Sequence, residues 1–294
     1  IHYNPLAPSE AEIAAGFTDT SLFEWFELLN LSETATLDLG SIAFDSGITL
    51  VIPTSTTLAP GERLVVPANA SAFTMRYGGL AEGRLLSLSY LNADGSNKFA
   101  NGGERVELLS AAAQTIADFI YSDDRPWPVS ADGAGYSLTL MCPDRNDPAL
   151  PQSWRSSAAI GGSPGGSDAI PLATWQNDNG VVDLLSDADF DGILSLIEYL
   201  SGTDPAIPNG SPLSAELGNG GADLRLELRQ RIGADEVDVT AERSGTLMDW
   251  NRAGVEYWGR ENNGDGTSTL RFRTPADGFV AGAGFLRLSV SEKE

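Results

Sequence analysis

Short runs of hydrophobic residues broken by polar residues fill the first 167 positions of the chain, and Gly, Pro, Asn and Asp separate the runs. Aromatic and branched side chains dominate them, a composition typical of β-strands. No amphipathic helix of crossover length lies between them, so the pattern predicts roughly seven to nine strands in a sandwich and not a parallel sheet. The clearest predicted strands are residues 22–31, 48–53, 62–68, 104–110, 115–122 and 136–142.

This β-rich region ends in the sequence IGGSPGGSD at residues 160–168. Glycines on both sides of Pro164 give the segment the composition of a flexible linker. The alternation returns at Asp223, where every second residue from Leu224 to Leu228 is a leucine and the residues between are charged. This is the pattern of a half-buried strand. The sequence NNGDG at residues 262–266 predicts a hairpin turn between two later strands.

Between the two β-rich regions lies the sequence SDADFDGILSLIEYLSGTDP, residues 186–205. Counted from the first aspartate, it matches D-x-D-x-D-G-x5-E, the calcium loop of the EF-hand type, at every specified position. Calcium takes six to eight oxygens, and a tightly curled loop aims alternate side chains at one centre. The predicted ligands are the carboxylates of Asp187, Asp189, Asp191 and Glu198, the backbone carbonyl of Ile193, and Ser195, directly or through water.

A short helix is predicted directly after this loop. Apolar residues recur at helical spacing from Ile193 to Leu200, and Gly202 provides a stop. No incoming helix of normal length is predicted upstream, so the pattern indicates a lone calcium loop and not a paired sensor. The alternative is a helix whose N-terminus is capped by acidic residues, without a metal. Three aspartates at alternate positions would then repel one another, which favours the cation.

The predicted fold is therefore mainly β and has three segments. Residues 1–167 form a β-sandwich, and residues 168–210 form a linker with the calcium-binding loop and its short helix. Residues 211–294 form a small antiparallel β-domain.

Charge narrows the range of partners. The chain has 18 basic and 41 acidic residues, a net charge of −23. Proteins that bind nucleic acid or anionic membranes gain affinity from positive surfaces, so both partners are disfavoured. No apolar run approaches the ~20 residues of a membrane helix.

The single cysteine, Cys142, cannot form an internal disulfide, and we expect a buried, inert thiol. The scarcity of thiols favours an exported protein.

The first segment resembles a lamin tail domain of the bacterial, secreted kind. The similarity rests on IHYNP (1–5), FEWFELLNLS (23–32), TLAPGERLVV (57–66), DGAGYSLTLMCPDRND (132–147) and SWRSSAAIGGSPG (153–165). This resemblance implies an immunoglobulin-like β-sandwich whose opening strand begins before Ile1. The calcium loop resembles those of dockerins and thrombospondin type 3 repeats, where the ion is structural. The C-terminal part, with LMDW at residues 247–250, is similar to a module of large surface proteins in Verrucomicrobia and Planctomycetes.

Catalytic chemistry has few candidate residues. The single histidine, His2, stands at the start of the sequence next to predicted strand residues, which disfavours serine–histidine catalysis. One histidine and one cysteine are too few for a histidine-based zinc site. Glu24 and Glu27 could form a carboxylate pair, but on a strand they would point to opposite faces. Trp127, between two prolines, is either a plug for the core or an exposed platform for sugar stacking, and the plug is favoured.

We therefore predict a non-enzymatic structural or adhesion module with a structural Ca²⁺ site, secreted or on a cell surface. Its partner would be an unknown protein or polysaccharide, without nucleic-acid binding or membrane insertion, and self-association is possible. One alternative is a carbohydrate-binding accessory module of a larger secreted enzyme, with Trp127, Trp154 or Trp258 stacking on sugars. Others are a self-assembling filament or surface-layer subunit, and a hydrolase with a carboxylate pair.

Overall fold

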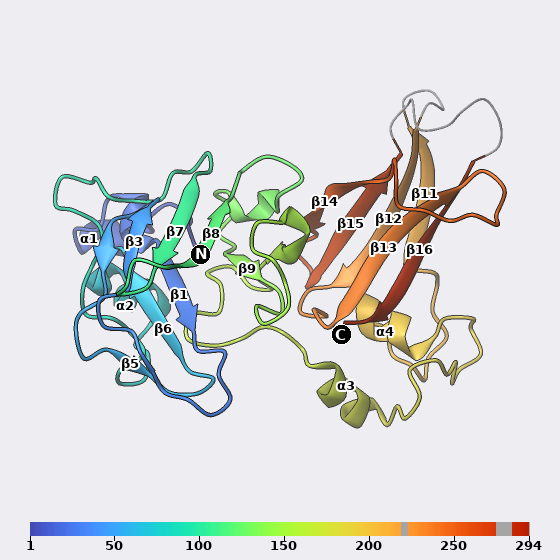
Figure 1. Cartoon of the computed structure of the whole chain (residues 1–294), viewed down its shortest axis with the longest axis horizontal. Coiled ribbons are helices and arrows are strands. Elements are labelled where there is room, and N and C mark those ends of the chain that lie inside the picture. Colours follow the sequence, from blue (N-terminus) through green and yellow to red (C-terminus); the bar gives the residue numbers. More distant parts are fainter. Residues whose placement is uncertain (219–222, 275–283, 294) are drawn as a thin grey trace. The chain divides into compact units, whose positions relative to one another are not determined.

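A computed structural model describes residues 1–218, 223–274 and 284–293 of the chain. The chain is mainly β, as predicted, and every strand pair of its sheets is antiparallel. It divides into two compact units, Ile1–Asp168 and Ala169–Glu294 (Figure 1).

The first unit contains one four-stranded sheet and three two-stranded sheets. The four-stranded sheet has the order β4-β3-β7-β8, with β3 Ala43–Ser46, β4 Leu50–Val51, β7 Arg105–Leu109 and β8 Thr115–Ile120. The two-stranded sheets pair β1 Trp25–Leu29 with β6 Arg63–Pro67, β2 Leu37–Asp38 with β5 Thr57–Leu58, and β9 Leu138–Leu140 with β10 Trp154–Ser156. The helices are α1 Glu10–Ala14 and α2 Ala70–Tyr77, and the 3-10 turns are Thr20–Phe23, Val129–Ala131 and Pro151–Ser153.

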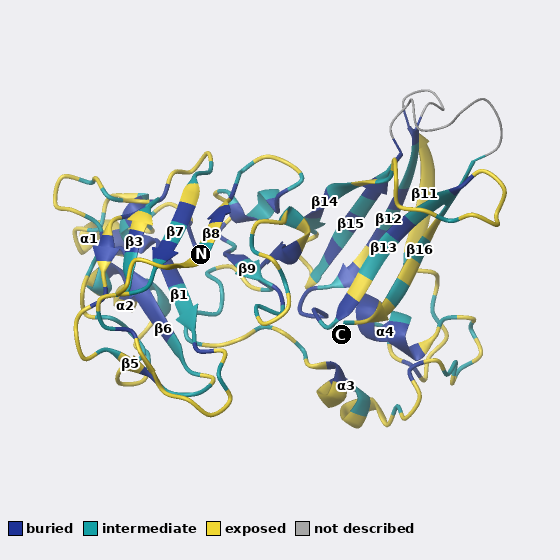
Figure 2. Cartoon of the chain, viewed as in Figure 1, coloured by how far each residue is buried: buried dark blue, intermediate teal, exposed yellow. Residues whose placement is uncertain are grey.

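Large aromatic and aliphatic side chains from all these sheets form the core of the first unit. Figure 2 colours the buried residues of the chain dark blue. Phe26 and Phe44 lie with their ring centroids 4.4 Å apart. Trp127 is 6% exposed and packs against Trp154, with ring centroids 6.0 Å apart. Trp127 therefore closes the core, the favoured of the two predicted roles. Neither of these tryptophans is available as an exposed platform for sugars.

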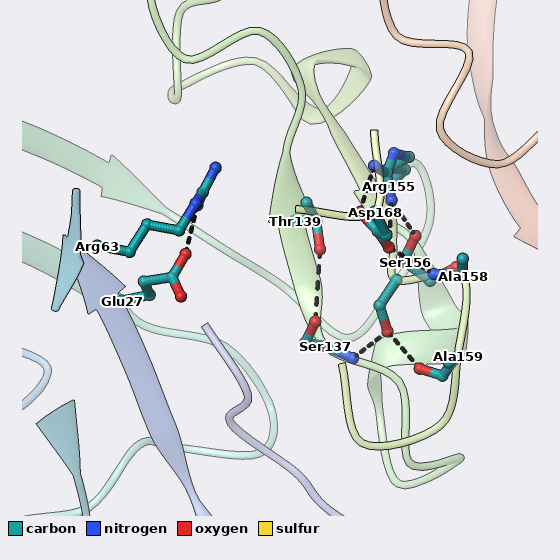
Figure 3. A network of polar contacts seen from close by, with 10 residues as sticks. Glu27, Arg63, Ser137, Thr139, Arg155, Ser156, Ala158, Ala159 and Asp168 are labelled. Atoms are coloured by element: carbon teal, nitrogen blue, oxygen red, sulfur yellow. Dashed lines mark hydrogen bonds and ion pairs between the residues drawn. The ribbon is translucent and has the colours of Figure 1, made fainter. Parts of the chain in front are cut away.

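The glycine-rich segment at residues 160–168 is fixed to the first unit by specific bonds. Arg155 is 2% exposed, and its guanidinium donates to the carboxylate of Asp168 at 2.7 Å (Figure 3). The same carboxylate accepts the backbone N–H of Ala158. The N–H of Gly165 donates to Glu27, which also pairs with Arg63. The segment whose composition predicted a flexible linker is therefore a loop held by hydrogen bonds. Its glycines allow the backbone to approach these bonding groups closely.

The second unit is built on a four-stranded sheet of order β11-β12-β15-β14. Leu226 and Leu228 are buried on one face of β12, while Arg225 and Arg229 lie on the other, as the alternation predicts. The strands of this sheet are β11 Leu213–Gly218, β12 Asp223–Arg231, β14 Glu256–Asn262 and β15 Thr267–Arg273. A second sheet pairs β13 Val237–Ser244 with β16 Phe285–Glu292.

Two helices pack into the core of the second unit, α3 Leu172–Asn179 and α4 Ser195–Ser201. Trp175 and Tyr199 share a hydrophobic cluster with Leu228 and Phe272. A helix as short as α4 is not stable alone in water, so packing against the sheet holds it. The structure therefore joins the segment predicted as a linker, residues 168–210, to the C-terminal β-domain from Ala169 onward. The eight-residue helix α3 lies upstream of the acidic loop, where no incoming helix of normal length was predicted.

Candidate metal centre

The loop before α4 gathers three carboxylates. Asp187, Asp189 and Asp191 each place one oxygen within 4.8 Å of the others, and all three residues are half-buried. Backbone amides of the loop bond to the same side chains. The N–H of Asp191 donates to Asp187 and to Asp189, both at 3.2 Å, and the N–H of Gly192 donates to Asp187 at 3.0 Å. These bonds curl the chain so that alternate side chains converge.

The curl requires two residues in the left-handed region of backbone conformation. Gly192 has φ of 90°, where a glycine has no steric cost. Phe190 has φ of 64°, which is rare for a non-glycine residue, and its ring is 90% exposed. The sequence pattern predicted the bend at Gly192 but gave no sign of the second one.

The helix α4 positions Glu198 next to these carboxylates. Glu198 is 1% exposed, and its Oε1 is buried with no hydrogen-bond partner. Burial, and then the negative charges of Asp189, Asp191 and Asp187, raise the pKa of Glu198 to about 7. Glu198 is not one of the three residues whose oxygens lie within 4.8 Å of one another. The charges of all three aspartates nevertheless contribute to its raised pKa.

A second carboxylate oxygen in the loop is also buried without a partner. This is Oδ2 of Asp189. Burial, together with the charges of Asp191 and Asp187, raises the pKa of Asp189. Buried polar atoms are satisfied in the great majority of cases, and leaving one unsatisfied costs about 1–3 kcal/mol. Two unpartnered oxygens beside a cluster of negative charge are the arrangement that a bound cation would satisfy.

The remaining two predicted ligands have different environments. The N–H of Ile193 donates to Asp191 at 2.7 Å, which places its backbone inside the curl. Ser195 is fully buried, and its hydroxyl donates to the carbonyl of Ser186 at 3.1 Å. The structure thus brings together the three aspartates, sets Glu198 beside them, and engages Ser195 with the start of the loop.

Two residues of the site were missed by the sequence pattern. The backbone N–H of Asn209 donates to Oδ2 of Asp191 at 2.6 Å. Asp204 adds to the negative charge that raises the pKa of Glu198. Both lie after α4, outside the twelve-residue motif, so its spacing carries no information about them. The bond from Asn209 links the loop to the chain segment that leads into β11.

The other candidate residues do not assemble a second carboxylate site. Glu24 is 1% exposed and accepts bonds from Tyr90 and Phe99, whereas Glu27 is bonded to Arg63 and Gly165. The two glutamates thus have separate partners.

The two other residues with reactive side chains lie in the first unit. His2 is 1% exposed, and its ring centroid lies 5.7 Å from that of Trp25. The thiol of Cys142 is half-buried and not fully buried as the sequence predicted.

Comparisons with protein-family models, with curated proteins and with solved structures gave no match for this chain. Among the residues that the structure describes, no helix has both the length and the apolar character needed to cross a membrane. The kind of ion that this centre could bind is therefore inferred from its own residues and geometry. Its donors are all oxygens, which hard divalent cations prefer, and a cluster of three aspartates can hold such an ion.

Proposed function

We propose that this chain is a non-enzymatic structural module of a secreted or cell-surface protein, and that Ca²⁺ bound in the loop before α4 stabilises its second unit. One observation carries the metal site: a buried, unpartnered oxygen of Glu198 lies under the charges of Asp187, Asp189 and Asp191. Glutamate at this position of the loop typically binds calcium with both oxygens.

Calcium fits this donor set better than other common cations. The side-chain donors are carboxylates with one backbone carbonyl, and thiol or imidazole ligands, which zinc favours, are absent from the cluster. Magnesium demands near-ideal octahedral geometry and keeps several waters, whereas calcium accepts six to eight oxygens in flexible geometry. Ser195 would act through water, as residues at this loop position often do. Its hydroxyl bond to Ser186 is compatible with that role.

The ion would stabilise the second unit through two connections. Glu198 lies on α4, whose other residues Leu196, Tyr199 and Leu200 are part of the hydrophobic core. Asp191 holds the N–H of Asn209 on the way to β11. By neutralising the carboxylates, a bound ion would therefore hold in place both α4 and the chain segment that leads into β11. With free calcium ~10 times the dissociation constant, the stabilisation is about 1.4 kcal/mol.

The proposed location follows from the affinity expected of such a site. Single loops in extracellular modules bind calcium at about 10⁻⁴–10⁻³ M, concentrations found outside cells. For the first unit we propose an immunoglobulin-like sandwich of the lamin-tail type. This unit would act in surface display or in adhesion to a protein or polysaccharide partner. Its antiparallel sheets and the large aromatic core that they share support this proposal.

Thermal unfolding of the whole chain with and without calcium tests the metal site. Millimolar Ca²⁺ should raise the unfolding temperature of the second unit, and Asp189→Asn or Glu198→Gln should remove most of the increase. Asp178→Asn is the matched control, because Asp178 is an exposed aspartate on α3, outside the loop. Titration calorimetry should give one Ca²⁺ per chain and weaker binding of Mg²⁺. An unchanged calcium response in both loop variants would contradict the proposal.

A further inference from the structure

The edge strand β11 combines exposed apolar side chains with backbone groups that face away from its sheet. Among the strands that the structure describes, it bonds to β12 on one side and is the outer strand of its sheet. Leu213 is 39% exposed and Leu217 is 71% exposed. Their partners across the ladder are Leu228 and Leu224, and directly opposite residues share one face of a sheet. The apolar residues of β11 therefore continue the core face of the sheet, but the core layer does not cover them.

The hydrogen-bond pattern shows which groups of β11 point outward. The N–H of Arg229 donates to the carbonyl of Pro212. Hydrogen-bonded and non-hydrogen-bonded pairs alternate along an antiparallel ladder, so Ser214 and Glu216 bond towards β12. The N–H and C=O groups of the three residues Leu213, Ala215 and Leu217 therefore point to the open edge. The N–H of Leu213 donates to the Ser211 hydroxyl at 3.2 Å, and that hydroxyl donates to the C=O of Leu213 at 3.4 Å; another strand would replace both local bonds.

The sequence of this edge, LSAEL at residues 213–217, is complementary to itself in the antiparallel direction. With Ala215 opposite Ala215 of a second copy, Leu213 lies opposite Leu217 at both ends. All three of these pairs consist of residues with outward-pointing backbone groups, and each such pair exchanges two N–H···O bonds. On the other face, Ser214 lies opposite Glu216, so a hydroxyl meets a carboxylate. No two like charges are opposed in this register.

We propose that β11 pairs with β11 of a second copy of this chain about a two-fold axis through Ala215. The two four-stranded sheets then form one continuous sheet, and the exposed leucines of each copy cover each other. Such an isologous contact is closed, so it produces a dimer and not a fibre. The pairing does not depend on calcium, and it is expected with the ion present or removed.

Two other edges of the structure are less suited to self-pairing. At the opposite side of the same sheet, β14 has a bulge between Tyr257 and Gly259, and bulges and charges protect edges from pairing. In the first unit, β8 exposes Ile116 and Ile120, but its register shifts at Ile116, and the charged Asp118 lies between the two isoleucines in the sequence. Symmetric pairing about Asp118 would place two carboxylates directly opposite each other, which is destabilising.

Sedimentation equilibrium of the full chain at physiological salt tests the proposal. The mass should rise with concentration to twice that of one chain, with calcium or with a chelator. Ala215→Pro removes one outward N–H and leaves the bonds to β12 intact, and Leu217→Lys adds a charge to the shared face. Each should weaken dimerisation at least about tenfold, a loss of about 1.4 kcal/mol. Ile120→Lys, at the equally exposed edge of β8, should leave it unchanged.

Cysteine cross-linking in a Cys142→Ser background tests the register. A mixture of Leu213→Cys and Leu217→Cys chains should cross-link through a short reagent, because paired Cα atoms lie about 5.5 Å apart. Leu213→Cys alone should not, since the two copies of residue 213 are then about 13 Å apart along the strands. A chain that stays monomeric at every soluble concentration would overturn the proposal. So would a dimer that survives both β11 variants, or one that cross-links through residue 213 alone.

Discussion

Glu24 gives the first unit a pH dependence that can be worked out from the structure. Its carboxyl group lies just before β1 and is 1% exposed. Oε2 accepts the backbone N–H of Phe99 at 3.0 Å and the hydroxyl of Tyr90 at 3.2 Å. Burial raises the pKa of Glu24 to about 8, and the two bonds offset only part of that effect. The folded protein therefore holds a neutral carboxyl group in its core at neutral pH.

The effect of this group on stability follows from the difference between its two pKa values. The folded pKa is about 8 and the ordinary value is 4.5. Because the folded pKa is raised, the contribution of Glu24 to the free energy of unfolding is fully present below pH 4.5. It is lost as the pH rises towards 8, since the unfolded chain releases the proton first. At about 1.4 kcal/mol per pH unit, the total loss approaches about 5 kcal/mol.

The substitution Glu24→Gln removes the titration and keeps an acceptor for Phe99 and Tyr90. Urea unfolding of both proteins between pH 4 and pH 8.5, followed by tryptophan fluorescence in chelator, measures the difference. The variant should gain stability relative to the natural chain across this window, with no further gain above pH 8. Glu33→Gln, at an exposed site, controls for the loss of one charge. Parallel pH profiles for Glu24→Gln and the natural chain would refute the reasoning.

Three further predictions concern the packing of the first unit and the acidic loop. Arg155→Leu should destabilise the first unit by about 3–5 kcal/mol, because it leaves the carboxylate of Asp168 without its buried partner. In urea unfolding, adding Asp168→Leu should recover part of that loss, and a purely additive result would contradict the pairing. Trp127→Ala should cost about 3–5 kcal/mol through the cavity it creates, whereas loss of polysaccharide retention without loss of stability would indicate a sugar platform instead. Gly192→Ala should weaken calcium binding, measured by calorimetry, because the alanine adds about 1–2 kcal/mol of backbone strain to the curled loop. Apart from the two neighbouring residues in the chain, no atom lies within 4 Å of the added Cβ, so backbone strain at φ of 90° is the main effect.

Local patterns in the sequence were sufficient to predict the elements that depend on neighbouring residues. The alternation of Leu224 to Leu228 predicted β12, because the period of side chains on a strand is fixed by its geometry. The spacing from Asp187 to Glu198 predicted a curled loop followed by a helix, because those residues are joined through a few backbone dihedrals. The pattern also predicted the bend at Gly192. Mainly-β structure in both parts of the chain followed from the same kind of evidence.

Tertiary structure decided everything that depends on residues distant in sequence. The burial of Glu198 comes from packing of α4 on the sheet, and the bond from Asn209 to Asp191 comes from the return of the chain after that helix. The glycine-rich segment before Asp168 is ordered by Arg155, a contact that composition cannot reveal. The open edge of β11 likewise depends on which strands become neighbours. Such contacts form because the whole chain packs to the lowest free energy, and a short stretch of sequence does not determine that packing.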